Sequence, residues 1–409
     1  MRTGILVLAA MISVSGMQST PAPLVVYNAV GHSVRVALMD PATGGLEWRG
    51  AMEKLRGDVN YGAMHPSGKY LYVAVSDRAL ANLIYAFSID GQTGMLTQLG
   101  EPFALPPGLS RAVHITMDNT GSYLLMAHNV TESVGVLTLG PDGRIGGLVS
   151  QPPMPKLGFL VHQIRIDPTN SWVFVPVRGN DAQPPAPELG GRMYLFSFNG
   201  GVLRQHQTIE YESGIGPRHL DFHPTQPWVY VLAERGNVLI TYKRDAAGLT
   251  ELFRTTSLKD PSFKFPEQRA GAIHIHPSGS WLYVTNRNVA PCASSVPCPD
   301  RETKPFAAGE NNIAQFSIDA STGKPTLVEH TDSRGFEPRT FTLDPAGNFL
   351  IAGNMMNIAR KEDDGRIADV QPNLSVFRIG TGGKLRYERS YDRAGEGQLW
   401  WVGAFHLQR

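Results

Sequence analysis

Short apolar runs separated by turn-rich segments fill the chain, and one arrangement of them returns about every fifty residues. A His/Asp-Pro-x-Gly-like turn leads into an aromatic or aliphatic run in HPSGKYLYV, DNTGSYLLM, DPTNSWVFV, HPTQPWVYV, HPSGSWLYV and DPAGNFLIA, which begin at positions 65, 118, 167, 223, 276 and 344. A second hairpin with an Asp/Gly-rich turn follows most copies, as in AFSIDGQTGMLTQL and QFSIDASTGKPTL. Two hairpins per repeat give four strands, which is the unit of a β-propeller blade.

The two ends of the chain supply one further blade. LWWVGAFHL, from Leu399, lies where a seventh inner hairpin would begin, and LVVYNAV, from Leu24, offers strands that close the ring with it. We therefore predict an all-β fold, a seven-bladed β-propeller of four-stranded antiparallel blades, as a single domain over residues 23–409.

Propeller geometry predicts which polar residues share a face. With the His or Asp of each turn as reference, residues five before and eleven after it lie at the same far end of the hairpin, because the two strands are antiparallel. These positions and their neighbours differ between repeats, whereas the turn and apolar positions stay alike. The polar residues so placed are His114, His162, Arg178, Arg218, His219, Glu234, Arg287, Arg339 and Asn354. Three long connections, 181–191, 288–311 and 357–373, open on the same face, so we predict a site at the channel mouth.

Composition narrows the classes of partner. A formal net charge of +1 with 18% charged residues gives no electrostatic footprint for nucleic acid or an anionic membrane. The 43 glycines and 30 prolines require frequent turns, in keeping with an all-β chain. We expect a monomer that acts on a small molecule.

The first residues have the layout of a secretory signal. Arg2 precedes an apolar stretch from Ile5 to Val14, and small and polar residues follow as far as Ala22. We predict that residues 1–22 are a signal peptide and that the protein is periplasmic or secreted. No other stretch is long and apolar enough to span a bilayer.

The chain has two cysteines, Cys292 and Cys298, in the Pro/Ser-rich segment NVAPCASSVPCPD. In an oxidising compartment this spacing predicts a local disulfide. A two-ligand metal site lacks an adjacent His or Cys to complete it, and the His274/His276 pair lacks a third ligand, so we predict no metal. His65, His223 and His276, in the turns on the opposite face, are expected to hydrogen-bond backbone.

Several motifs resemble the lactonase family of seven-bladed propellers, which includes bacterial 6-phosphogluconolactonase and the fungal carboxy-muconate cyclising enzymes. These motifs are GPRHLDFHP, LYVTNR and EPRTFTLDPAGNFL, and the resemblance covers about residues 25–407. It implies a functional His, Arg, Glu and Arg on one channel face, at His162, Arg218, Glu234 and Arg287. Where the family has an acidic Asp-Leu-Gly segment, this chain reads Val177-Arg178-Gly179.

The resemblance and the predicted cluster together suggest lactone hydrolysis without a cofactor. Glu234 would deprotonate the attacking water, and His162 would protonate the leaving ring oxygen. Arg218 and Arg287 would stabilise the oxyanion or hold a substrate carboxylate. The expected substrate contacts are His219, His114, Arg339, Asn354 and Arg178.

Three other interpretations remain open. The same residues would serve an intramolecular lyase of the muconate-lactonising type, in which a carboxylate held by arginine adds to an alkene. A propeller without enzymatic activity would bind a glycan or a protein through this face. In the third interpretation, Glu234 and Arg218 form only a structural ion pair between hairpin ends.

Overall fold

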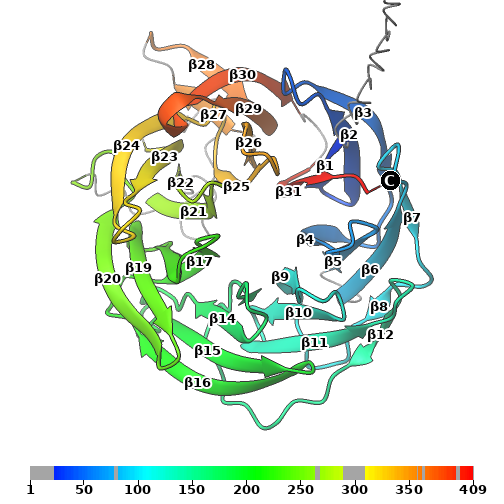
Figure 1. Ribbon diagram of the computed structural model, residues 1–409. Coiled ribbons are helices and arrows are strands. Elements are labelled where there is room, and N and C mark those ends of the chain that lie inside the picture. Colours follow the sequence, from blue (N-terminus) through cyan, green and yellow to red (C-terminus); the bar gives the residue numbers. More distant parts are fainter. Residues whose placement is uncertain are drawn as a thin grey trace, which may run out of the picture.

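The apolar runs of the repeat form the buried inner strands of seven antiparallel sheets, which a computed structural model of the protein arranges in a ring (Figure 1). The structure describes residues 23–77, 82–262, 268–288, 309–356, 358–361, 364–392 and 397–408. The predicted all-β fold of seven four-stranded blades is confirmed, and the described residues contain one short 3-10 helix, η2 (Thr381–Gly383). The predicted signal peptide and both cysteines lie outside the described residues.

Each sheet runs from an inner to an outer strand. One blade consists of β4 (Asp58–Met64), β5 (Tyr70–Ser76), β6 (Asn82–Ile89) and β7 (Leu96–Gln98), and the short strand β8 (Phe103–Ala104) also pairs with β6. The next blade consists of β9 (Ala112–Met117), β10 (Tyr123–His128), β11 (Ser133–Leu139) and β12 (Ile145–Leu148). The third blade along the chain consists of β13 (Arg165–Ile166), β14 (Trp172–Val177), β15 (Arg192–Asn199) and β16 (Val202–Glu210). The fourth consists of β17 (Pro217–Phe222), β18 (Trp228–Ala233), β19 (Val238–Asp245) and β20 (Gly248–Thr256).

The ring continues with β21 (Gln268–Ile275), β22 (Trp281–Asn288), β23 (Asn312–Ile318) and β24 (Pro325–Asp332). Next come β25 (Pro338–Leu343), β26 (Phe349–Asn354), β29 (Asn373–Ile379) and β30 (Leu385–Asp392). The last blade is β31 (Leu399–His406), β1 (Leu24–Val30), β2 (Ser33–Met39) and β3 (Leu46–Met52).

The last blade joins the two ends of the chain, as predicted. β31 pairs antiparallel with β1 in a register that sets Leu24 opposite His406, and Figure 1 shows the red and blue strands side by side. Trp401 of β31 is 4% exposed and packs in an apolar cluster with Tyr27 and Val59. The C-terminal strand therefore completes both a sheet and an inter-blade core.

The histidines of the HP turns connect neighbouring blades. Nε2 of His65 lies 3.0 Å from the Gly121 carbonyl oxygen, and the ring of His223 reaches the Gly279 carbonyl oxygen, also at 3.0 Å. Nδ1 of His223 accepts a hydrogen bond from the Thr225 amide, so Nε2 carries the proton and donates. Gly279 has φ +74, and a Cβ there would lie 2.5 Å from the His223 ring, which explains why the turn ends in glycine. The expected backbone bonding of these histidines is confirmed.

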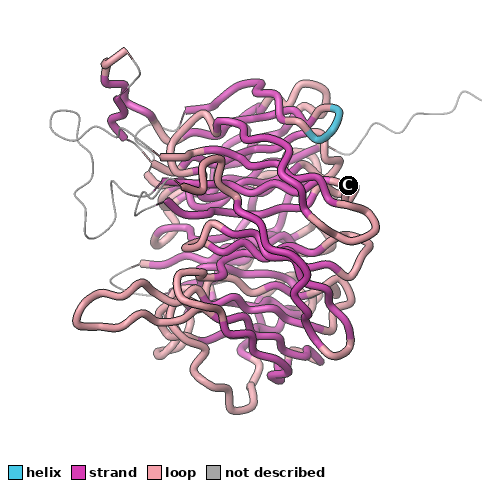
Figure 2. The backbone as a smooth tube through the Cα atoms, turned by 90° about the vertical axis from the view of Figure 1, so that its left-hand side faces the viewer, coloured by secondary structure: helices cyan, strands magenta, loops and turns pink. Residues whose placement is uncertain are grey.

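The long connections of the opposite face include two described segments with backbone pairing of their own. Residues 181–191 fold back on themselves through bridges that pair Asn180 with Leu189 and Gln183 with Ala186. The connection 357–373 contains a hairpin of β27 (Ile358–Lys361) and β28 (Ile367–Val370), which projects from this face in Figure 2. Most of the third connection, residues 289–308, lies outside the described part. Among the described residues, the structure has no helix that could cross a membrane.

Candidate active site

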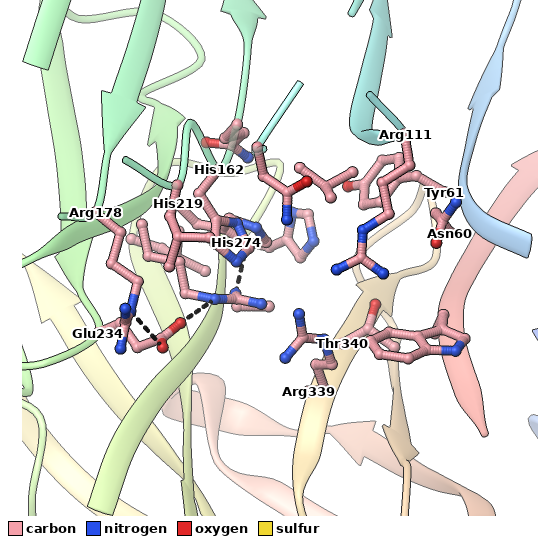
Figure 3. Close-up of a pocket in the computed structure, with 18 residues that line it drawn as sticks. Asn60, Tyr61, Arg111, His162, Arg178, His219, Glu234, His274, Arg339 and Thr340 are labelled. Carbon is pink, nitrogen blue, oxygen red and sulfur yellow. Dashed lines mark hydrogen bonds and ion pairs between the residues drawn. The ribbon is translucent and has the colours of Figure 1, made fainter. Parts of the chain in front are cut away.

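A cavity of about 280 Å³ lies at the ends of the inner strands, where the repeat analysis places the polar cluster (Figure 3). Six of the predicted residues line it: His162, Arg178, Arg218, His219, Glu234 and Arg339. Its other polar and aromatic lining residues include Asn60, Tyr61, Arg111, Asn129, Gln163, His274, Thr340 and Trp400. The volume suits a small molecule.

β-Bulges bring consecutive side chains into this cavity. In β17 the register shifts between Pro217 and His219, so Arg218 is the extra residue and both Arg218 and His219 line the cavity. β25 has the same shift around Arg339, and β4 has it around Asn60. A regular strand would send neighbouring side chains to opposite faces, so the bulges are what double the polar groups at this place.

Glu234, directly after β18, is the centre of a buried ion-pair cluster. Its Oε1 lies 2.8 Å from Nε of Arg178, and its Oε2 lies 2.7 Å from Nε of Arg218. Arg287 reaches Oε2 at 3.1 Å, and Arg269 reaches Oε1 at 3.3 Å. One carboxylate thus faces four guanidinium groups.

These neighbours decide the ionisation of Glu234. Burial alone would raise the pKa of its carboxyl, but Arg178, Arg287 and Arg218 together hold the pKa well below its usual range. A carboxylate with so low a pKa and with guanidinium groups at both oxygens is a weak proton acceptor. The surroundings therefore favour the ion-pair interpretation of Glu234 over the general-base one.

Arg287 acts behind the cavity wall, because it is 3% exposed and does not line the cavity. Its Nη1 donates to Oε1 of Glu337 at 2.5 Å, while its Nη2 faces Glu234. Burial raises the pKa of Glu337 although Arg287 opposes that shift. Glu337 precedes the bulge of β25, a position that the repeat comparison did not include.

Burial favours the neutral form of two central histidines of the site, His162 and His219. Arg218 Nη1 lies 3.2 Å from Nδ1 of His219, and because guanidinium can only donate, Nδ1 is the acceptor and Nε2 carries the proton. The His219 ring centroid lies 5.2 Å from that of His162 and 6.0 Å from that of His114. Burial, with Arg218 next, lowers the pKa of His162 and of His219 well below the usual range. These rings can donate hydrogen bonds but carry no extra proton near neutral pH.

A second pair of arginines faces the cavity from the other side. Figure 3 shows the guanidinium groups of Arg111 and Arg339 turned toward the open centre. The guanidinium carbon of Arg339 lies 4.9 Å from the Trp400 ring centroid, and no acidic group of the described residues pairs with it. Burial and the charge of Arg287 lower the pKa of Arg339 to about 10. Arg111 lies just before β9 and Trp400 within the closing strand β31, and neither was among the residues predicted from the repeat.

Two predicted residues lie away from this cavity. Asn354 is fully buried, and its Nδ2 donates to the Ser333 carbonyl and to Oδ1 of Asn373, both at 2.8 Å. This places it in the packing between blades rather than at a substrate. His114 lines a second cavity of about 360 Å³, farther along the ring axis, and not the first.

The two cavities share Tyr61, His274 and Thr340 among their lining residues. Arg165 and His274 both face Asp221, at 2.9 Å from Nη2 of Arg165 and 3.6 Å from Nδ1 of His274. Within the described residues, no three His, Cys, Asp or Glu side chains are placed to hold a metal ion.

Comparison with known proteins gives consistent matches. The family profile described as "Lactonase, 7-bladed beta-propeller" matches residues 24–379. A 6-phosphogluconolactonase of Pectobacterium atrosepticum is 30% identical over 334 residues, covering 80% of this chain and 86% of that protein. One from Bacillus subtilis is 26% identical over 303 residues, covering 72% and 78%. The solved periplasmic gluconolactonase of Pseudomonas aeruginosa superposes with a TM-score of 0.72 at 19% identity, covering 95% of this chain and 100% of that one.

Proposed function

The chain belongs to the lactonase family of seven-bladed β-propellers, and from that membership we propose that it is an exported lactone hydrolase. Its proposed substrate is a small sugar-acid or similar lactone that carries a negative charge of its own. The reaction takes place in the cavity at the channel mouth.

The main support for an anionic substrate is the excess of positively charged side chains that line the cavity. Four arginines line it, Arg111, Arg178, Arg218 and Arg339, against a single carboxylate, that of Glu234. Glu234 is already shared among several arginines, and no acidic side chain of the described residues forms an ion pair with Arg339. A guanidinium that faces the cavity without an ion-pair partner is suited to bind a carboxylate or phosphate group of the substrate. Relatives whose names specify a phosphorylated lactone agree with such a group.

Arg218 and His219 are the proposed groups that stabilise the oxyanion. Hydrolysis puts negative charge on the lactone carbonyl oxygen in the transition state, and donors fixed beforehand stabilise it most. Arg218 is fixed by Glu234 and by the Gly271 carbonyl oxygen, which accepts from its Nη1 at 2.5 Å. The neutral His219 adds an Nε2–H donor beside it.

Glu234 is proposed to hold the arginines in place rather than to take a proton. Its oxygens fix Arg178 and Arg218 within the cavity wall and Arg287 behind it. His162, next to His219, is proposed to bind the leaving ring oxygen as a neutral donor. The general acid expected of His162 would need a protonated ring, which its burial opposes.

Export is proposed from the first 22 residues and is tested separately. Expressing the full chain in a Gram-negative host and fractionating the cells should place the protein outside the cytoplasm, with a shortened N-terminus by mass. An uncleaved chain in the cytoplasm would contradict export. Thiol labelling of the same sample tests the predicted disulfide between Cys292 and Cys298.

The substrate is tested with lactones matched in pairs, one member bearing a carboxylate or phosphate and the other neutral. We expect faster hydrolysis of the charged member, mainly through a lower KM, followed as proton release. Equal kcat/KM for both members would contradict the anionic substrate. Proton uptake with a muconate would instead indicate the cyclising reaction, because that reaction turns a carboxylate into an ester. Binding without turnover of any of them would indicate a non-enzymatic propeller.

A further inference from the structure

We propose that His274, oriented by Asp221, is the general base that activates water in this cavity. The inference rests on the proposed lactone hydrolysis and adds a residue to it. His274 lies on β21, three strands along the chain from Glu234, and it lines both cavities.

His274 can be reached from the first cavity because Ala272, two residues before it on β21, is small. Side chains four positions before the turn reach the axis from successive blades, and they are Tyr61, His114, Gln163, His219, Ala272 and Thr340. Among these, Ala272 has no side-chain atom beyond Cβ. His274, two residues farther along the same face of β21, is therefore reached from the first cavity, and its side chain is 31% exposed.

Several hydrogen bonds fix the Asp221 carboxylate, so that it can orient the His274 ring. Its Oδ1 accepts from Arg165 at 2.9 Å and from the Phe222 amide at 3.0 Å, and its Oδ2 accepts from the Ile275 amide at 3.0 Å. Burial would raise the pKa of Asp221, but Arg165 and His274 lower it to about 2, so the carboxylate is ionised. Oδ2 lies 3.6 Å from Nδ1 of His274, close enough to stabilise an imidazolium once it forms.

The ring of His274 is also held from its side. The Phe341 ring meets it edge to face at 4.8 Å between centroids. The charged and titratable groups that face it are Asp221, Arg165, His114 and Tyr61, and no described acidic group other than Asp221 pairs with it. Nδ1 is directed to Asp221, which leaves Nε2 for a water molecule in the cavity.

The other titratable groups of the first cavity are less suited to accept a proton. Glu234 has both oxygens occupied by arginines, and Nδ1 of His219 is occupied by Arg218. Burial, and then the positive charge of Arg218, lower the pKa of His162 and so disfavour its protonated form. His274 instead faces a carboxylate, with Oδ2 of Asp221 3.6 Å from its Nδ1.

The proposed hydrolysis proceeds through a tetrahedral intermediate. Nε2 of His274 takes a proton from water while the water oxygen bonds to the lactone carbonyl carbon. The carbonyl π electrons move to the oxygen beside Arg218. When the intermediate collapses, the ring C–O bond breaks and the proton passes from the imidazolium to the leaving oxygen. The product is a hydroxy acid, which ionises and releases one proton to solvent.

His274→Gln tests the proposal. We expect kcat to fall by about a hundredfold or more with little change in KM, and the acid limb of the kcat pH profile to disappear. The melting temperature should stay near that of the wild type, because the side chain is partly exposed. His206→Gln, an exposed histidine on the outer strand β16, is the matched control and should keep full activity.

His274→Ala gives a second readout that a structural role would not move. Added imidazole should restore part of the lost turnover, and Ala272→Leu, which closes the approach, should lower kcat with His274 still present. Wild-type kcat in His274→Gln, or an unchanged pH profile with no imidazole rescue in His274→Ala, would overturn the assignment and leave the lactonase proposal intact. A wild-type protein that hydrolyses no lactone of the charged or neutral panel would overturn both.

Discussion

Glu234 is the residue on which the stability of the site depends. Glu234→Gln leaves Arg178, Arg218, Arg287 and Arg269 without their shared negative charge, and breaking a buried ion pair costs about 3–5 kcal/mol. We therefore expect a lower melting temperature together with reduced turnover. Measuring both on one sample separates this role from general-base catalysis, which predicts a hundredfold loss of kcat in a protein of unchanged stability.

The same carboxylate makes the stability depend on pH. The folded pKa of Glu234 lies well below the unfolded value of about 4.3. Its contribution is therefore complete above that unfolded value and is lost as the pH falls toward the folded pKa. We expect the wild-type melting temperature to drop more steeply below about pH 4 than that of Glu234→Gln. Parallel curves for the two proteins would contradict this.

Arg339 is expected to determine charge recognition. Arg339→Gln removes the guanidinium that stacks on Trp400 and faces the cavity, so KM for an anionic lactone should rise by about ten- to a hundredfold. KM for the matched neutral lactone should hardly change, which supplies the internal control. Arg192→Gln, in an exposed pair with Glu210 on the outer strands, is the matched surface control. Equal losses for both lactones would show that Arg339 has only a structural role.

At the scale of strands and turns, most of the fold could be predicted from the sequence repeat. The HP and DP turns predicted the inner hairpins and the histidine bonds to the next blade, because those bonds recur wherever the turn does. The β-bulges at Arg218 and Arg339 were not predictable, since a one-residue register shift depends on the pairing strand and leaves no periodic signal. The β27–β28 hairpin lies inside one insertion and has no copy elsewhere in the chain.

Most of the residues predicted for the candidate site lie there, but some do not, and some lining residues were not predicted. Six of nine candidates line the cavity because they sit at equivalent positions of the repeat. Arg111 and Trp400 were missed because one lies outside that register and the other lies in the blade closed by both ends of the chain. Asn354 was placed at the right end of its hairpin, but its side chain turns into the contact between blades, where Ser333 and Asn373 bind it.

The turn histidines give a prediction about blade packing. His223→Ala removes a hydrogen bond to the Gly279 carbonyl and leaves the Thr225 and Gln226 amides without their acceptor. We expect a loss of about 1–3 kcal/mol in the free energy of unfolding. Turnover well below the melting temperature should be unchanged, because the turn lies at the opposite end of the strands from the site. Chemical denaturation and activity assays on the same protein would check both statements.

At the scale of the whole molecule, we expect the stability of the fold to depend on the pairing of β31 with β1, which closes the ring. Deleting residues 400–409 removes almost all of β31, exposes the edge of β1 and takes Trp401 from its cluster. We expect the truncated protein to lose cooperative unfolding and to aggregate. A truncated protein with an unchanged melting transition would show that the other six blades form a stable unit without closure.

The pairing of β1 with β31 also orders events during biosynthesis. Leu24 cannot meet His406 until the ribosome has translated nearly the whole chain, so the ring is still open while most of the protein is being made. Closing a loop of that length carries a large entropic cost, which delays the native topology further. The protein therefore reaches its native topology only after synthesis of the chain is nearly complete, and until then the edge of β1 that will pair with β31 is open.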